Sequence, residues 1–219
     1  MHARGDCLVQ NWNNSEIWST DQIPSGKQFD HWCDFVNQAH LTWNISRQNL
    51  DCFPAFIREG RFGDVRVVNL TSAEKNIRGD RGAREIARDD VELYNLLYIN
   101  KGSECLMFND KDVVLDADEF MLWDSTRPMG FITGENLHQV TFCLSKDKLH
   151  AALPNAETFV GRSIKAVNGL NRLFIDHLLT LDQQFGALPK NQADAVLEST
   201  IELLALTLSA QEATQKTRA

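Results

Sequence analysis

The sequence predicts an α+β domain in which an antiparallel β-sheet is buried on both of its faces. The first observation is that short apolar runs alternate with polar connectors of three or four residues between residues 83 and 128. Connectors this short cannot hold a crossover helix, so the strands they join must be antiparallel. The second observation is that apolar residues recur at helical spacing before and after these strands. We therefore expect a sheet flanked by helices.

The central stretch contains four apolar runs, which we interpret as strands of one antiparallel meander. The connectors are rich in Asn, Asp and Gly, which tolerate left-handed backbone or bond to their own main chain. We therefore expect sequential strands to be neighbours. One further strand is expected before this stretch and two after it. The expected strands are 64–71, 93–99, 105–108, 113–115, 120–123, 129–133 and 138–144.

Both faces of these strands are apolar. Phe120 and Leu122 alternate with Met121 and Trp123 along one strand, so neither face of that strand is polar. A sheet with one face in water would alternate apolar with polar residues. One face must therefore look into a sandwich or barrel interior, and helices must cover the other.

Helices are expected at both ends of the chain. Ser25 and Gln28 form a capping box at the start of an amphipathic helix that reaches residue 40. A short helix over 145–153 is followed by an antiparallel helical hairpin, 168–185 and 191–209, with Gly186 as the stop of the first member. The charged segment 72–90 mixes acidic with basic residues, which favours a solvated loop and edge strand over a phosphate site.

Composition excludes several classes of function. The chain has 219 residues and a net charge of −8, so its field repels a nucleic-acid backbone. Five cysteines without a CxxC pattern indicate reduced thiols. No apolar run resembles a signal peptide or is long enough to span a bilayer, so we expect a cytoplasmic protein with no membrane contact.

The strands lack the residues of a catalytic centre. No histidine occurs between His40 and His138, so a cupin-type metal site cannot be assembled from the strands, and we expect no metal and no cofactor. The G-x-S-x-G, G-x-G-x-x-G and Walker A patterns are absent. We expect no catalytic residue and no enzyme. A small cupin-like barrel enzyme without a recognisable metal site and a plain dimerisation or scaffold module are the alternatives.

Most of the chain resembles the N-terminal effector-binding and dimerisation domain of AraC/XylS-family transcription regulators, in the branch that controls catabolism of aromatic compounds and amines. The segments that carry the resemblance are Phe29 with Trp32, Arg84-Glu85-Ile86-Ala87 taken as a strand, 94–102, 115–120, Asp124-Ser125-Thr126-Arg127-Pro128 and 149–154. The resemblance implies an antiparallel jelly-roll, or cupin-like, β-barrel flanked by an N-terminal helix and a C-terminal helical hairpin. Asp118-Glu119 replaces the Gly-Asp usual in the family, and Asp118 is expected to keep the left-handed turn.

The resemblance also implies partners and a division of the chain. We expect an arm over 1–24, a ligand-binding helix and barrel over 25–160, a dimerisation region over 161–213 and a linker remnant over 214–219. The partners are a small-molecule inducer and a second copy of the chain. DNA would be contacted only through a C-terminal helix-turn-helix domain that is not in these residues.

The candidate ligand site is aromatic and apolar, which suits a small aromatic or apolar inducer. Trp123 is expected at a strand end, on the same face as Met121, with Arg84 and His138 as polar groups that orient the inducer. The candidate ligand-binding residues are Trp123, Met121, Tyr94, Tyr98, Phe108, Phe131, His138, Phe142 and Arg84. The candidate dimerisation residues are Ile201, Leu203 and Leu206 on the last helix.

Overall fold

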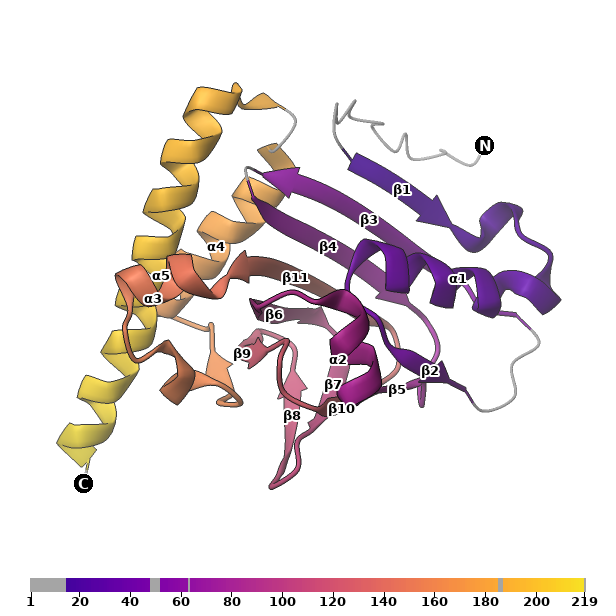
Figure 1. Cartoon of the computed structure of the whole chain (residues 1–219), viewed down its shortest axis with the longest axis horizontal. Helices are drawn as coiled ribbons and strands as arrows, with labels where there is room; N and C mark the ends of the chain where they lie inside the picture. Colours follow the sequence, from indigo (N-terminus) through magenta and orange to yellow (C-terminus); the bar gives the residue numbers. More distant parts are fainter. Residues whose placement is uncertain (1–14, 48–51, 63, 185–186, 219) are drawn as a thin grey trace, which may run out of the picture.

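The strands form two antiparallel sheets that pack face to face as a jelly-roll barrel (Figure 1). The computed structural model describes residues 15–47, 52–62, 64–184 and 187–218. Within these residues the larger sheet has the order β1(Ser15–Ser19), β3(Ala55–Phe62), β4(Val65–Ser72), β11(Leu137–Ser145), β6(Leu93–Lys101), β9(Glu119–Asp124), β12(Ile164–Lys165). The smaller sheet has the order β2(Asn44–Ser46), β5(Arg78–Arg81), β10(Met129–Thr133), β7(Ser103–Met107), β8(Asp112–Asp116).

Helices flank the barrel on two sides. Short 3-10 turns lie at Thr20–Gln22 and Ala156–Phe159. The α-helices are α1(Ser25–Ala39), α2(Ala83–Asp89), α3(Lys146–Ala152), α4(Gly169–Gln184) and α5(Lys190–Arg218). In Figure 1, α3, α4 and α5 lie together on one side of the larger sheet and α1 lies on the other. The predicted fold class, an α+β antiparallel barrel with a helix before it and a helical hairpin after it, is confirmed.

The expected simple meander is wrong. Strands β7 and β8 do form a hairpin, but β6 pairs with β9 and β11, whereas β7 pairs with β8 and β10. Between β4 and β11 the chain therefore crosses from one sheet to the other after every strand except within the β7–β8 hairpin. A three-residue connector such as Asn100-Lys101-Gly102 can turn a barrel corner as readily as it can close a hairpin, and Gly102 does so with φ of +79°.

Two hydrophobic cores lie on opposite faces of the larger sheet, so the prediction that both faces are buried is confirmed. One core joins the outer face to α3, α4 and α5 through residues such as Phe120 and Phe174. The other fills the barrel and includes Trp32 of α1 together with Leu97 and Trp123. Side chains alternate between the cores along each strand because successive residues of a strand point to opposite faces.

Helix α1 begins as predicted but is not capped as predicted. Its N-cap is Pro24, and no side-chain capping bond is present at its start. The amide of Gln28 instead donates to the main-chain oxygens of Thr20 and Ile23, and its oxygen accepts from the Phe53 amide at 2.6 Å. Gln28 therefore ties the helix to the chain before it and to the start of β3.

The charged segment 72–90 differs from the expected loop and edge strand. Its β5 strand is internal to the smaller sheet, and residues 84–87, expected as a strand, belong to helix α2. The Glu85 carboxylate accepts from the Gly82 amide at 3.0 Å and so stabilises the first turn of that helix. The helix-capping bond of Glu85 therefore decides the local structure, and residues 84–87 form a helix instead of the expected strand.

Several boundaries also differ from the sequence analysis. Strands β2 and β3 lie in a segment that was not assigned, and β1 lies within the expected N-terminal arm, where it pairs with β3. Helix α5 continues to Arg218, through most of the expected linker remnant. The predicted stop at Gly186, like residues 1–14 of the arm, lies outside the described residues.

The turn at Asp118 and the turn after β9 match the predictions. Asp118 has a left-handed φ of +62°, and its amide donates to the Ile99 oxygen at 2.9 Å. In the second turn, Asp124 accepts from the Thr126 amide at 2.8 Å and pairs with Lys146 at 2.7 Å. The carboxylates of Asp118 and Asp124 also accept hydrogen bonds, from the Tyr98 hydroxyl and the Thr126 amide, which a glycine at either position could not do.

Candidate functional site

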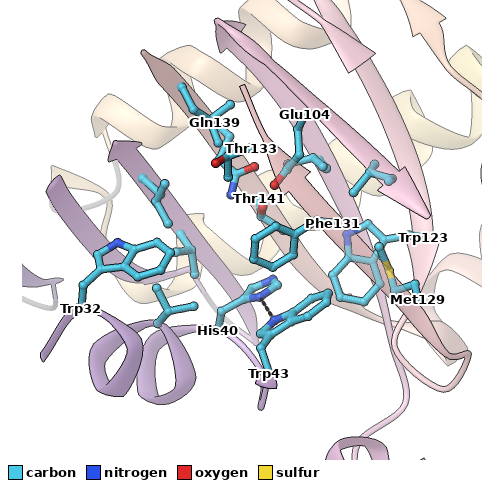
Figure 2. Close-up of a pocket in the computed structure, with 16 residues that line it drawn as sticks. Trp32, His40, Trp43, Glu104, Trp123, Met129, Phe131, Thr133, Gln139 and Thr141 are labelled. Atoms are coloured by element: carbon cyan, nitrogen blue, oxygen red, sulfur yellow. Dashed lines mark hydrogen bonds between the residues drawn. The ribbon is translucent and has the colours of Figure 1, made fainter. Parts of the chain in front are cut away.

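A cavity of about 50 Å³ lies in the barrel interior, between the two sheets and helix α1 (Figure 2). Its lining comes from α1, the segment after it and six strands. The lining residues are Trp32, Val36, His40, Trp43, Val68, Leu70, Leu97, Glu104, Leu106, Trp123, Met129, Phe131, Thr133, Leu137, Gln139 and Thr141. The wall is mostly aromatic and aliphatic with a few polar groups, which is the composition of a small-molecule site.

The aromatic part of the wall is a connected set of rings. Trp43 meets Trp123 edge-on at 5.7 Å between ring centroids and Phe131 at 5.0 Å. The imidazole of His40 stacks on Trp43 at 6.2 Å and meets Trp123 edge-on at 5.7 Å. Since each ring fixes the orientation of the next, these four side chains present a pre-organised apolar surface.

Glu104 is the acidic group of the cavity. It lies on β7 opposite Thr133 of β10, is 3% exposed, and its carboxyl points toward the ring of Phe131 (Figure 2). Among the described residues, no hydrogen bond or ion pair acts on this carboxyl group. Burial raises the pKa of Glu104 to about 8, because the interior disfavours the charged form.

His40 is a neutral hydrogen-bond donor to the cavity. Burial, followed by the positive charges of Arg66 and Arg81, lowers the pKa of His40 to about 3. Its Nδ1 accepts from the Trp43 indole at 3.2 Å, so the proton of the neutral ring lies on Nε2. That Nε2 is buried with no partner among the described residues.

Other polar atoms in the barrel also lack partners within the described part of the chain. They are the indole nitrogen of Trp32, the side-chain oxygen of Gln139 and both amide atoms of Asn95, which lies beside Trp123 in the strand register. Buried polar groups are usually hydrogen-bonded, and leaving one unpaired costs about 1–3 kcal/mol. Three of these groups, on Trp32, His40 and Gln139, line the same cavity, which is typical of a site that is completed by a ligand or by water.

Trp123 and Phe131, two of the candidate ligand-binding residues, line the cavity. Met121 belongs to the same core as Trp123, on the expected shared face of β9, and Phe108 packs against that core, but neither lines the cavity. These placements follow from strand parity, which the sequence did not determine.

Tyr94, Tyr98 and Phe142 lie on the wrong face for this cavity, which corrects the predicted site. All three belong to the core under the C-terminal helices. The Tyr94 hydroxyl contacts the His150 imidazole at 3.0 Å, and the Tyr98 hydroxyl donates to Asp118 at 2.9 Å. The physical reason is the two-residue period of a strand, which points the even-numbered residues of β6 away from the barrel.

The two predicted polar groups also lie outside the cavity. Arg84 is exposed on α2. The His138 imidazole is held at the edge of β11 between Asn100 at 2.7 Å and Asn69 at 3.0 Å. Neither contacts a cavity residue through any bond of the described chain, so the polar groups that the sequence analysis offered are replaced by Glu104, Gln139 and His40.

These three groups, together with Trp32 and Trp43, are what sequence reasoning missed. Glu104 could have been found from the sequence, because it stands two residues before Leu106 on the same strand, so both side chains point into the barrel. Trp32, His40 and Trp43 had no such signal, since α1 and the segment after it are placed over the barrel only by tertiary packing, and Gln139 depended on the parity of β11.

The predicted dimerisation residues fall into two groups. Ile201 is buried in the core and Leu203 packs against it, whereas Leu206 is 57% exposed. Leu206 borders a surface groove between α3 and α5 that also contains Ala151 and Ala205.

Two features of the described residues bear on other functions. No group of three or more His, Cys, Asp or Glu side chains there is arranged to hold a metal ion. Among the helices of the described chain, none combines the length and apolar character needed to cross a bilayer.

Known proteins share this fold and sequence pattern. Residues 32–209 match the family described as the AraC-binding-like domain. An uncharacterized protein from the nit 5′ region of Bacillus sp. (strain OxB-1) is 20% identical over 137 residues, 63% of this chain and 52% of that protein. This chain therefore spans about half the length of that relative.

The solved structures include one with the same architecture over nearly the whole chain. The crystal structure of the AraC-like transcriptional activator CuxR superimposes with a TM-score of 0.73 at 13% identity, covering 89% of this chain and 70% of that one. The match shows a common fold. Since the family match covers most of the chain, this protein belongs to the AraC-binding-like domain family, whose members are ligand-sensing domains of transcription regulators.

Proposed function

We propose that this chain is the effector-binding domain of a transcription regulator and that the effector binds in the barrel cavity. The observation that carries the proposal is the cavity itself, which is walled by four connected rings. Gln139 and His40 each bring to it a buried polar atom without a partner in the described chain, and no hydrogen bond or ion pair of that chain acts on the Glu104 carboxyl group. A ligand that pairs with those atoms would form hydrogen bonds that the described chain does not make.

The same cavity argues for binding rather than catalysis. Its titratable side chains are Glu104 and His40, and the imidazole is neutral because its pKa is about 3, so it is a poor general base near neutral pH. The family also points to a regulator domain. We infer that the domain acts in the cytoplasm and that DNA is contacted by a separate part of the regulator, since a net charge of −8 repels phosphate.

Trp123→Phe and Trp123→Ala are expected to weaken binding of an effector in the cavity, Ala more than Phe, because the indole is part of the aromatic wall and meets both Trp43 and His40 edge-on. A ligand-shift screen by thermal melting identifies the effector, since a ligand at 100 times its dissociation constant stabilises the protein by about 2.7 kcal/mol. Calorimetric titration into the two variants then tests the location.

Tyr98→Phe is the control for this test, because Tyr98 is as fully buried as Trp123 but lies on the opposite face of the sheet. Its affinity for the effector should be unchanged. Trp123→Ala should cost less than the roughly 3–5 kcal/mol typical of a fully packed core tryptophan. Unchanged affinity in a folded Trp123→Ala variant would place the ligand elsewhere.

We also propose that the domain self-associates through the face of α5 that carries Leu206. A large apolar side chain that is 57% exposed beside a groove with both apolar and charged lining residues is a candidate contact between two copies. Leu206→Arg is expected to dissociate the dimer, since an unpaired charge at a buried seam costs several kcal/mol. Sedimentation at tens of micromolar measures it.

Leu173→Arg is the matched control, because Leu173 is 65% exposed on α4. It should leave the dimer intact. Ile201 and Leu203 are unsuitable positions for this test, because they contribute to the core and a charge there would unfold the chain. A parent protein that sediments as a monomer, or a dimer split by Leu173→Arg alone, would refute this seam.

A further inference from the structure

We propose that the effector is a small organic cation whose ammonium group binds the Glu104 carboxylate while the aromatic rings of the cavity enclose its apolar part. The inference rests on the proposed effector-binding function and narrows the chemical class of the effector. It departs from the aromatic or apolar inducer expected from the sequence.

The position of Glu104 is the first argument. A carboxyl group that is 3% exposed and has no partner among the described residues is costly to bury. Its strongest complement is a cationic donor, because hydrogen bonds between ionised partners are about twice as strong as neutral ones. In this fold that donor must come from the ligand, since the lining of the cavity contains no Lys or Arg side chain.

A second acceptor lies on the same side of the cavity. The side-chain oxygen of Gln139 is buried without a partner in the described chain, and Gln139 is drawn beside Glu104 and Thr133 in Figure 2. An ammonium group carries three N–H donors. It can therefore satisfy the carboxylate and the amide oxygen together, which a hydroxyl group with one donor cannot.

The rings supply the third argument. Trp43, Trp123 and Phe131 line the cavity together, with centroids 5.0 to 5.7 Å apart along the chain of contacts. The faces of aromatic rings, tryptophan above all, attract cations through their quadrupoles within about 6 Å. The aromatic rings and the Glu104 carboxylate therefore both favour a positively charged ligand.

An anionic effector is disfavoured by the same groups. The charged or titratable side chains that line the cavity are Glu104 on β7 and His40, which directly follows α1, and the imidazole is neutral. The two nearby arginines lie outside the lining: Arg81 is held by Asp89 and the main-chain oxygens of Thr42 and Ser125, and Arg66 lies farther along β4. A carboxylate ligand would meet Glu104 without a compensating cation.

The size of the cavity limits the ligand. At about 50 Å³ it is smaller than the roughly 150 Å³ cavity that holds a benzene ring in a model protein. An ammonium group with a short carbon chain fits the described conformation. A benzyl group requires a ring of the wall to turn aside.

The test compares ligands that share a carbon skeleton and differ in the charge and hydrogen-bonding groups of the head group. Propylamine, butylamine and benzylamine are titrated calorimetrically into the purified chain beside the alcohol and carboxylate of the same carbon skeleton. We expect at least one amine to bind tenfold or more tightly than its alcohol, and its carboxylate not to bind. Equal or tighter binding of the alcohol or carboxylate overturns the cation inference and leaves the effector-binding function standing. If no amine binds but a neutral or anionic library compound does, the inference fails alone. If nothing binds, the proposed function fails with it.

Glu104→Gln tests the assigned carboxylate, because it removes the charge and keeps the shape. The variant should lose at least tenfold in amine affinity and keep its alcohol affinity within twofold. The control is Glu135→Gln, which removes the same charge from an exposed turn where Glu135 pairs with Lys75, and amine binding should be unchanged. Equal losses for amine and alcohol in Glu104→Gln would show a structural role and refute the proposal.

The pH dependence of binding is a second readout. Since burial raises the pKa of Glu104 to about 8 and His40 stays neutral, amine affinity should rise about tenfold per pH unit toward pH 8 and then level. Glu104→Gln should show no such rise. A flat profile in the parent protein would contradict a carboxylate that must ionise to bind.

Discussion

Asp89→Asn is expected to lower the free energy of unfolding by about 3 kcal/mol, the lower end of the range for breaking a buried ion pair. Asp89 pairs with Arg81, whose side chain is fully buried, and it accepts hydrogen bonds from the amide and hydroxyl of Thr42 at 3.0 and 2.7 Å. The variant leaves a buried guanidinium without its anion. The lower end applies because Asp89 itself is 14% exposed.

The same change should also weaken the cavity wall. Thr42 precedes Trp43, so the hydrogen bonds between Asp89 and Thr42 hold in place the segment that carries one of the four rings. Chemical denaturation at pH 7 measures the loss of stability, and titration of the effector measures the loss of affinity. Asp90→Asn is the matched control, because the neighbouring residue is exposed and asparagine tolerates its left-handed φ of +47°. Equal stabilities of the two variants would contradict the buried-pair argument.

The Asp89 pair also has a defined pH dependence. Burial alone would raise the pKa of Asp89, but hydrogen bonds from Thr42 and the pairing with Arg81 outweigh it and lower the pKa below its ordinary value. A carboxyl whose pKa is lower in the folded state contributes its stability above the unfolded pKa of about 3.8, and that contribution is lost as the pH falls through the folded pKa. The pair should therefore be intact at neutral pH.

Glu104→Gln is expected to stabilise the effector-free protein at pH 8 by up to about 4 kcal/mol, because each unit of pKa shift corresponds to about 1.4 kcal/mol. In the unfolded chain this glutamate ionises near pH 4.5, whereas in the folded protein its pKa is about 8. The folded state thus binds the proton more tightly. The contribution of Glu104 to stability is therefore most favourable below pH 4.5, falls as the pH rises from 4.5 to 8, and is constant above that.

Denaturation curves of the parent and Glu104→Gln proteins between pH 5 and pH 9 measure this difference. The two curves should diverge as the pH rises, with the variant more stable at pH 8. Glu135→Gln should follow the parent, because that carboxyl is 61% exposed. Parallel curves for the parent and Glu104→Gln would mean that the pKa of Glu104 is close to its ordinary value. They would contradict a buried carboxyl group without a partner.

Sequence alone was sufficient for the class of the domain and for most of its regular elements. Tight polar connectors implied antiparallel strands, apolar residues on both strand faces implied two cores, and helical spacing implied α1 and the hairpin of α4 and α5. Each of these depends on chemistry within a few residues of the chain. Asp118 illustrates the point, since its tolerance of left-handed backbone is a local property and its φ is +62°.

Strand pairing and strand parity were decided only by the tertiary structure. Whether a three-residue connector closes a hairpin or turns a barrel corner depends on which strand lies beside it, and β6 pairs with β11, about forty residues away. A shift of one residue moves a side chain to the opposite face, so Tyr94 and Tyr98 could not be separated from Leu97 by sequence pattern. The cavity follows from those choices. It combines His40 and Trp43 with Glu104 and Gln139, residues that only the packing of α1 over the barrel brings together.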